Sequence, residues 1–303
     1  MSNIAKIKTY FKKEFVGDFS FDESLKEHTW YKIGGSAAVL CSPESEDSLI
    51  ALLKKCKELF VDYFILGDGA NVLVSDAGFK GVIITLKSSL NKCFVHEQKL
   101  FAEAGAYLND VILLAQDNGL AGLESLSGIP GTVGGALYMN AGIDSGNIGD
   151  VVEKVMILND EFEMETLEAK DIDFGYRNVP QLKNKIILGT LMNMKKSSSE
   201  ELSKFRNDLL RKRAEKQPLG CPSCGSVFKR PDGFFVGKMV QDLGLKGFRI
   251  GGAEISEKHA GFIINSGNAT AADVIAVIEK IKLEVLNEYN VELETEVKLL
   301  GFK

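Results

Sequence analysis

The sequence predicts an α+β fold in which strands cluster instead of alternating strictly with helices. One helix, at residues 108–115, precedes several strands predicted between residues 152 and 194, an order that does not fit a doubly wound parallel sheet. A strand at 61–66 runs into Gly67-Asp68-Gly69, but Val72 stands where a dinucleotide-binding fingerprint needs its third glycine, and no long helix follows. We therefore expect a fold outside the Rossmann type.

The stretch from Gly119 to Gly142 dominates the chain, because it holds seven glycines and Glu124 is its only charged residue. Glycine accepts positive φ and lets a ligand approach the backbone, and consecutive N–H groups left open in this way form a nest for an anion such as phosphate. The segment 67–71 is a second glycine cluster. The alternative for the long stretch is a tight glycine-rich loop in a buried corner.

Apolar spacing and cap residues predict the elements in order. Helices are expected at 4–15, after the cap residue Ser45, at 108–115, and after Thr270, which forms a capping box with Asp273. Strands are expected at residues 37–41, 61–66, 82–86, 93–95, 100–104, 152–158, 163–167, 186–194 and 291–300. The last strand should direct Val291, Leu293, Val297 and Leu299 to one face.

Composition limits the classes of function. The 303 residues are 45% hydrophobic and 26% charged, with a net charge of −6, which argues against nucleic-acid and membrane-surface binding. No apolar run reaches the ~18 residues of a membrane span, and the N-terminal residues do not resemble a secretory signal. Arg211-Lys212-Arg213 is interpreted as a solvated face.

Five cysteines, an odd number in a long chain, favour the reducing cytoplasm. Cys221 and Cys224 have the spacing of a zinc or redox pair, but no second ligand pair accompanies them. We therefore expect no metal site.

Six motifs, in order, make the chain resemble the UDP-N-acetylenolpyruvoylglucosamine reductase family over nearly its whole length. They are HTWYKIGG (28–35), GDGANVL (67–73), GIPGTVGGA (128–136) with MNAG (139–142), FGYR (174–177), PSCGSVFKRP (222–231) and LETEV (293–297). Each motif alone is weak, but their joint order is specific.

The resemblance implies an FAD-binding fold of the vanillyl-alcohol-oxidase type in two lobes, plus a C-terminal α+β substrate domain. The lobes would be residues 1–87 and 88–197, the connector 198–218 and the substrate domain 219–293, with the strand 294–303 returning to the first lobe. The implied reaction uses NADPH and non-covalent FAD to reduce the enolpyruvyl ether of UDP-N-acetylglucosamine to UDP-N-acetylmuramate. That product enters peptidoglycan synthesis, and hence cell-wall biogenesis, cell shape, cell division and the cell cycle. The chain would be a cytoplasmic monomer or weak oligomer.

The resemblance also implies the site residues. Cofactor contacts would come from Gly67, Asp68, Gly69, Ala70, Asn71, Val72, Ile129, Pro130, Gly131, Thr132, Gly134, Gly135, Asn140, Ala141 and Gly142. Lys229 and His259 would contact the nucleotide substrate, and Arg177, Ser226 and Glu296 would be catalytic.

Each catalytic residue type suits the implied chemistry. Attack on the vinyl carbon places negative charge on the neighbouring carbon and its carboxylate, which the cation of Arg177 would stabilise. The carbon must then be protonated, and the hydroxyl of Ser226 would be the general acid. A carboxylate such as Glu296 would repel the charge unless it were protonated or polarised the proton donor, so its role stays open.

Some residues depart from the family pattern. Val179 replaces a serine common after the Tyr-Arg pair, Cys224 replaces a smaller residue, and Lys298 replaces arginine. The short span between Phe228 and Val236 leaves no room for a tyrosine-bearing lid, so the chain resembles the lidless type.

Two other functions remain open. Another FAD oxidoreductase or oxidase of the same fold, acting on an alcohol or sugar, would consume oxygen with a small alcohol. A nucleotide-binding module without enzymatic activity would carry no flavin and would be colourless.

Overall fold

A computed structural model describes residues 2–302, and these divide into two compact units. The first contains the chain up to Phe21, Val39–Asp68 and Gly81–Arg213, and the second contains Asp22–Ala38, Gly69–Lys80 and the chain from Ala214 onward. Each unit has its own core of buried apolar side chains. No helix within residues 2–302 is long and apolar enough to cross a bilayer.

A four-stranded sheet and two helices come from the N-terminal third of the chain. The sheet has the order β1 (Gly17–Ser24), β2 (Ser36–Pro43), β5 (Phe79–Ile84), β3 (Tyr63–Ile65). The helices are α1 (Asn3–Lys13) and α2 (Glu46–Leu59), which contact each other. Ser45 caps α2 by accepting from the Ser48 backbone N–H, as the sequence predicts. Ile7 and Phe11 of α1 and Leu49 and Leu53 of α2 are fully buried in the first core.

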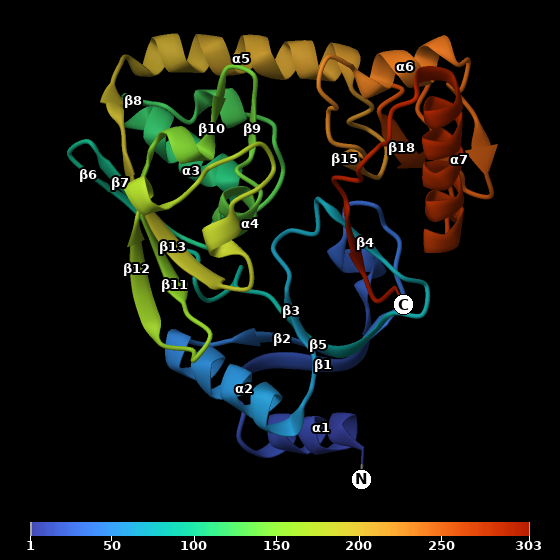
Figure 1. Ribbon diagram of the computed structural model, residues 1–303. Coiled ribbons are helices and arrows are strands. Elements are labelled where there is room, and N and C mark those ends of the chain that lie inside the picture. Colours follow the sequence, from blue (N-terminus) through green and yellow to red (C-terminus); the bar gives the residue numbers. More distant parts are fainter. Residues whose placement is uncertain (1, 303) are drawn as a thin grey trace. The chain divides into compact units, whose positions relative to one another are not determined.

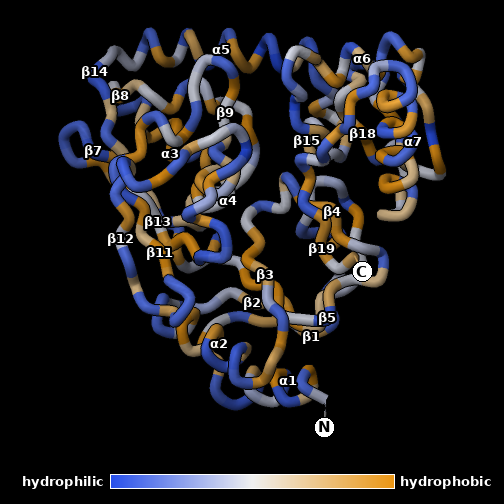
Figure 2. The backbone as a smooth tube through the Cα atoms, in the orientation of Figure 1, coloured by the Kyte–Doolittle hydropathy of each residue, from blue (hydrophilic) through white to orange (hydrophobic). Residues whose placement is uncertain are grey.

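An antiparallel five-stranded sheet is the largest sheet of the first unit (Figure 1). Its order is β12 (Met164–Glu168), β11 (Val152–Leu158), β13 (Ile186–Asn193), β7 (Lys99–Glu103), β6 (Cys93–His96). In Figure 2, β11 and β13 are largely hydrophobic, as expected for central strands. The strands predicted at residues 93–95, 100–104, 152–158, 163–167 and 186–194 are confirmed in position, and the first two pair as neighbours in this sheet.

The next elements are helices, two-residue strands and 3₁₀ turns. The helices here are α3 (Leu108–Asp117), α4 (Val133–Tyr138) and α5 (Ser199–Lys216), and only Leu202 of α5 is fully buried. The short strands are β8 (Leu120–Ala121), β14 (Lys195–Lys196), β9 (Gly142–Ile143) and β10 (Gly146–Asn147). Single 3₁₀ turns are η1 (Leu25–His28), η2 (Glu124–Leu126), η3 (Ile148–Asp150), η4 (Ala169–Asp171) and η5 (Pro180–Leu182).

The second unit is built on another four-stranded antiparallel sheet. Its order is β15 (Ser223–Ser226), β18 (Phe262–Asn265), β17 (Ala253–Ile255), β16 (Arg249–Ile250), and its helices are α6 (Val236–Asp242) and α7 (Ala271–Tyr289). The predicted Thr270–Asp273 capping box begins α7. A separate parallel pair joins β19 (Lys298–Leu300) to β4 (Val72–Val74), so the C-terminal strand does return to the segment after the first glycine loop.

The predicted strand over residues 291–300 is wrong in length and in facing. Only Lys298–Leu300 is a strand, and Leu299 is 47% exposed whereas Leu300 is buried. The physical reason is a change of partner, because residues 294–296 bond to the segment 227–229 and residues 298–300 pair with β4. The chain turns between these two partners, so side chains along residues 291–300 do not alternate regularly between a buried and an exposed face. The division of the first half into lobes at residue 87 stays a prediction.

Candidate functional site

In the first unit, the two glycine-rich loops meet. A Cβ added to Gly67 would lie 2.7 Å from Thr132 Oγ1, so the loop after β3 packs directly on the long glycine stretch. The long stretch is held by backbone bonds: Leu108 N donates to Gly131 O at 3.0 Å, and Gly134 N donates to Ala104 O at 2.8 Å. Gly67 and Thr132 lie 65 residues apart in the sequence, yet their loops contact each other in the fold. We call these two loops together the cradle.

Gly131 is the position in this cradle that most favours a ligand. Its φ of +138° is a conformation that residues with side chains rarely adopt, and a Cβ built on it meets no atom within 4 Å. The backbone is therefore strained for other residues and open on the side where a Cβ would stand. This is what close approach of a phosphate to the backbone requires.

Asp68, in the first glycine loop, forms an ion pair with Lys87. Its Oδ1 lies 3.2 Å from Lys87 Nζ, and this ammonium also lies 5.8 Å from the centre of the Tyr107 ring. Lys87 follows a predicted strand at residues 82–86 and belongs to no motif, so the sequence does not single it out.

Arg177 lies against the end of the glycine stretch. Its Nη2 donates to Gly142 O at 2.9 Å and its Nη1 to Asn140 O at 3.4 Å, while its guanidinium lies 5.1 Å from the Tyr176 ring centre. Its φ is +54°, a left-handed conformation. The structure therefore brings the predicted cation to residues predicted to contact the cofactor.

Asn140 holds the turn that carries Arg177. The Asn140 side chain is 3% exposed, and its Nδ2 donates to Phe174 O and Gly175 O at 3.1 Å each. Its Oδ1 accepts from Gly149 N at 3.1 Å. Because every polar atom of this amide has a protein partner, its side chain acts as a brace for the turn at 174–177.

In the second unit, Ser226 and Glu296 lie on neighbouring segments. Gly225, with φ of +73°, precedes Ser226, and the pairing of β15 with β18 is irregular between Ser223 and Ser226. Ser226 is exposed, and the next residue, Val227, accepts through its carbonyl from Glu296 N at 2.8 Å. Two predicted catalytic residues 70 positions apart are thus brought together.

Asn71 joins the first glycine loop to the Glu296 segment. Its Nδ2 donates to Glu296 O at 3.2 Å, and its own carbonyl accepts from Lys298 N at 3.0 Å. Gly69 in the same loop lies so close to the carbonyl of His28 that any Cβ would collide with it. The residues of the motifs at 28–35, 67–73 and 293–297 that belong to this unit therefore form one connected structure.

Cys224 is buried beneath the Ser226 turn. Its Sγ donates to Val72 O at 3.2 Å, and burial raises the pKa of this thiol far above its usual range. Cys221 is exposed, and both thiols are free. Within residues 2–302, no group of three His, Cys, Asp or Glu side chains is arranged to hold a metal ion.

Lys229 and His259, the predicted substrate contacts, both have protein partners. Lys229 Nζ lies 2.5 Å from Glu294 Oε1. His259 Nδ1 accepts from Gly261 N at 3.1 Å, so the ring proton is on Nε2 in the neutral form. Burial, followed by the nearby charge of Lys246, lowers the pKa of His259, which favours that neutral form.

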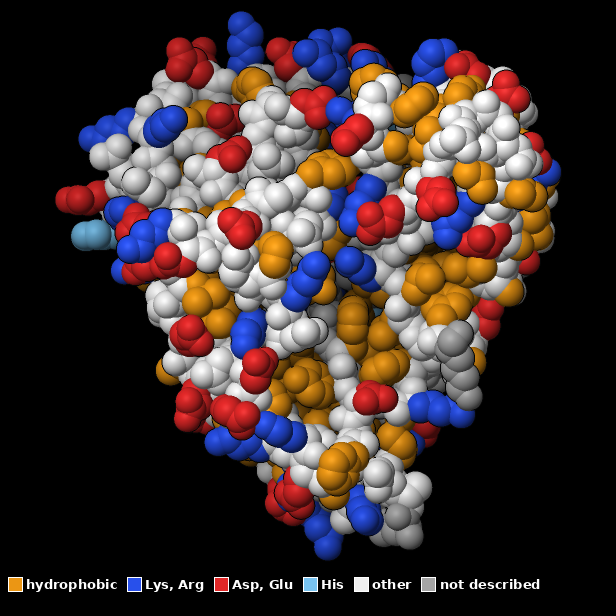
Figure 3. All heavy atoms as spheres, viewed as in Figure 1, with side chains coloured by type: hydrophobic (Ala, Val, Ile, Leu, Met, Phe, Trp, Pro, Cys, Tyr) orange, Lys and Arg blue, Asp and Glu red, His pale blue; other side chains and the backbone are white. Residues whose placement is uncertain are grey.

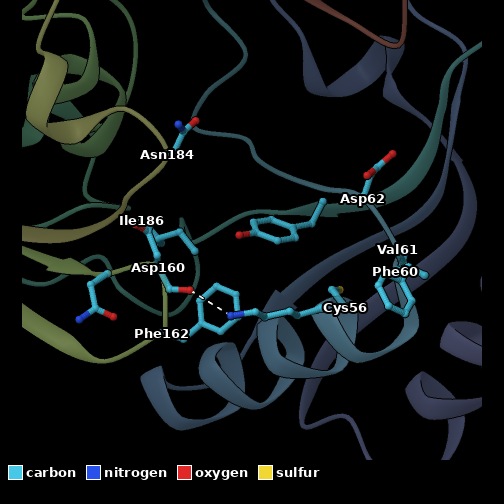
Figure 4. Close-up of a pocket in the computed structure, with 11 residues that line it drawn as sticks. Cys56, Phe60, Val61, Asp62, Asp160, Phe162, Asn184 and Ile186 are labelled. Atoms are coloured by element: carbon cyan, nitrogen blue, oxygen red, sulfur yellow. Dashed lines mark hydrogen bonds between the residues drawn. The ribbon is translucent and has the colours of Figure 1, made fainter.

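A pocket of about 420 Å³ lies away from all predicted site residues, between the end of α2 and the β11–β12 turn (Figure 4). Phe60, Asp62, Phe162 and Asn184 contribute to its lining, and Lys57 Nζ donates to Asp160 O across it at 3.4 Å. On the face of the molecule seen in Figure 3, acidic and basic side chains are interspersed.

Comparison with known proteins assigns both parts of the chain. Residues 37–166 match the family model of an FAD-binding domain, and residues 217–300 match that of the C-terminal domain of UDP-N-acetylenolpyruvoylglucosamine reductase. The first match contains the cradle around Gly131, and the second contains Ser226 and Glu296.

Whole-length relatives agree with these matches. The reductase of Caldanaerobacter subterraneus subsp. tengcongensis is 44% identical over 99% of this chain and 98% of its own. That of Oceanobacillus iheyensis is 43% identical over 92% and 91%. The crystal structure of the Thermus caldophilus reductase has 30% identity and a TM-score of 0.80, covering 94% of this chain and 99% of that one. The fold is therefore α+β with an FAD-binding domain of the vanillyl-alcohol-oxidase type, and the chain belongs to the UDP-N-acetylenolpyruvoylglucosamine reductase family.

Proposed function

We propose that this chain reduces the enolpyruvyl ether of UDP-N-acetylglucosamine to UDP-N-acetylmuramate, using Arg177, Ser226 and Glu296. The observation that carries the proposal is the pairing of the Ser226 and Glu296 segments, with Glu296 N only 2.8 Å from Val227 O. Bound FAD supplies the hydride, which it receives from NADPH. The residues of the chain hold the cofactor, bind the substrate and move a proton.

The two glycine loops hold the cofactor. Gly67, Asp68 and the segment from Ile129 to Gly142 contribute from the first unit. At Gly131 the backbone conformation and the open space on its Cβ side support a phosphate contact.

Arg177 binds the substrate carboxylate, beside which negative charge develops. A planar guanidinium suits this role because it presents a fixed fork of donors to two oxygens. Its bonds to the carbonyls of Asn140 and Gly142, and the brace from Asn140, hold the fork in one orientation before substrate binds.

Ser226 Oγ donates the proton to the substrate carbon, and Glu296 orients or polarises that hydroxyl. The positive φ of Gly225 lets the chain turn just before Ser226, while Cys224 on the other side of Gly225 is tied to Val72. Asn71 fixes the backbone of Glu296 from the first glycine loop. The turn is therefore supported on both sides.

Lys229 and His259 bind the nucleotide part of the substrate. A neutral His259 can donate through Nε2, because Nδ1 already accepts from Gly261. Lys229 would exchange part of its bond to the exposed Glu294 for a phosphate.

We further propose a cytoplasmic location, a monomer or weak oligomer, and roles in cell shape and division through peptidoglycan synthesis.

The test is the visible spectrum of the purified protein under anaerobic conditions. A flavin spectrum should bleach on addition of NADPH and return on addition of the enolpyruvyl substrate. A colourless protein that binds the UDP-sugar would instead identify a nucleotide-binding module. A flavin that the substrate leaves bleached, but that oxygen and a small alcohol turn over, would identify an oxidase.

A further inference from the structure

Arg213, near the end of α5, packs on the beginning of the long glycine loop. A Cβ placed on Gly128 would lie 3.3 Å from Arg213 Cδ and 3.4 Å from its Nε, and 2.8 Å from Leu210 Cδ2. The sequence favours a solvated face for Arg211-Lys212-Arg213, but for Arg213 this interpretation is wrong. In helical spacing it shares the inward side of α5 with Leu202, Arg206 and Leu210.

Hydrogen bonds along α5 place this side against α3 and against Ser127 at the start of the Gly128–Gly131 loop. Ser199 Oγ donates to Gln116 O at 2.7 Å, and Arg206 Nη2 donates to Asn109 Oδ1 at 3.3 Å. Figure 1 shows α5 running alongside α3. Arg213 is therefore held at this place by a helix that is bonded at several points.

The polar groups around Arg213 are incompletely paired. Its Nη1 donates to Ser127 O at 3.2 Å, but its Nε is buried without a partner, and so is the hydroxyl of Ser127, a fully buried residue. Among residues 2–302, no carboxylate lies within ion-pair distance of Arg213. Burial without a compensating acid accordingly lowers the pKa of its guanidinium.

Arg213 as a residue is half-buried, but its Nε is fully buried. A buried donor left without a partner is unfavourable, and an anion bound beside it would remove that cost. Arg211 on the same helix makes the contrast, because it is exposed and lies 3.6 Å from Asp208. The orphaned groups also lie at the start of the Gly128–Gly131 loop, whose far end has the open backbone at Gly131.

We propose that Arg213, with the Ser127 hydroxyl, binds the pyrophosphate of FAD. The pyrophosphate is favoured over the diphosphate of the UDP-sugar because Ser127 and Gly128 lie within the matched FAD-binding domain, residues 37–166. The proposal rests on the FAD-dependent function above, but it concerns cofactor affinity and not turnover. Arg213 would thus contribute to the cradle the cation that its glycines lack.

The experiment titrates FAD into the flavin-free full-length protein and follows flavin fluorescence. Arg213→Met keeps the aliphatic stem and removes the charge, and it should raise the Kd for FAD by about 10- to 100-fold, as expected for a hydrogen-bonded charge. Arg213→Lys should fall in between, because a point charge replaces the fork. The matched control Arg211→Met, on the exposed side of the same helix, should leave the Kd unchanged.

Competition by ADP and UDP distinguishes binding of the FAD pyrophosphate by Arg213 from binding of the substrate diphosphate. Thermal unfolding distinguishes it from a purely structural role. ADP, which carries the diphosphate, should lose affinity in proportion to FAD in Arg213→Met. Loss of UDP affinity with unchanged FAD affinity would overturn the proposal in favour of the substrate diphosphate. Without flavin, Arg213→Met should have the same melting temperature as the parent protein. Added FAD should raise the melting temperature of the variant less than that of the parent. An equal drop in melting temperature with and without FAD would show a purely structural role.

A milder pair of variants covers the case in which Arg213→Met does not fold. Arg213→Lys and Ser127→Ala should each raise the Kd for FAD, and unchanged values in both would overturn the proposal. The FAD contact and the proposed reaction can fail separately. Suppose that these variants raise the Kd for FAD, but that the parent protein shows no turnover of NADPH and the enolpyruvyl substrate at saturating FAD. The proposed reaction is then refuted, and the FAD contact is retained.

Discussion

Replacing Asn140 by aspartate should disable the Arg177 turn while leaving the cofactor cradle in place. Aspartate keeps the shape of the side chain and can still accept from Gly149 N, which lies 3.1 Å from Oδ1. It loses the Nδ2 donor that bonds Phe174 O and Gly175 O at 3.1 Å each. Both carbonyl oxygens would then face a carboxylate oxygen.

The size of the effect follows from burial. Asn140 is 3% exposed, so water cannot replace the lost donor. An unsatisfied buried acceptor costs about 1–3 kcal/mol, and two of them cost about 2–6 kcal/mol. A shift of ~3 kcal/mol in the equilibrium of the turn corresponds to about a 100-fold loss of the ordered state. We therefore expect binding of the substrate carboxylate by Arg177 to be impaired by a comparable factor.

Anaerobic stopped-flow absorbance of the two half-reactions measures this. Bleaching by NADPH should change little in Asn140→Asp, whereas return of the flavin colour with the enolpyruvyl substrate should slow by about 100-fold. Asn118→Asp is the matched control, because its exposed Nδ2 also donates to a carbonyl, Leu114 O at 2.8 Å, at the end of α3. A folded, flavin-loaded Asn140→Asp protein with a normal second half-reaction would refute the reasoning.

The remaining predictions concern four positions. Ser226→Ala should leave bleaching by NADPH nearly unchanged and slow the substrate half-reaction by ~100-fold or more, and equal slowing of both halves would make Ser226 structural. Arg177→Lys should impair only the second half-reaction, measured in the same way. Gly131→Val should lose flavin, determined as FAD released on heating, and normal FAD content would place the phosphate elsewhere. Burial lowers the pKa of His259 in the folded state, so below pH ~6.5 the unfolded state binds more protons than the folded state. The free energy of unfolding, measured with urea, should therefore fall as the pH falls through that value. The fall should be smaller in His259→Gln.

Local signals in the sequence predict most elements well. Ser45 and the Thr270–Asp273 pair begin helices as expected, because capping depends on a few neighbouring residues. The glycine positions likewise indicate where the backbone must be open, and Gly131 has the expected positive φ. The motif order identifies the family before any contact is known.

Contacts between distant segments are what the sequence does not show. The strand predicted at 291–300 is shortened because its two halves bond to different partners. Arg213 appears in a basic run typical of a solvated face, and only its packing on Gly128 separates it from Arg211. Asn140 matches a cofactor motif, whereas its side chain is occupied by the turn 34 residues later.

The pairing of β19 with β4 bears on synthesis of the chain. Lys298 donates to Asn71 across more than 220 residues of sequence, so a growing chain exposes its first glycine loop long before the partner strand has been made. Such non-local pairing is slow because the intervening loop must be closed before the contact stabilises it. The second unit can therefore be completed only after residues 298–300 have left the ribosome, and a chain stalled before them would present β4 as an unpaired edge to chaperones and proteases.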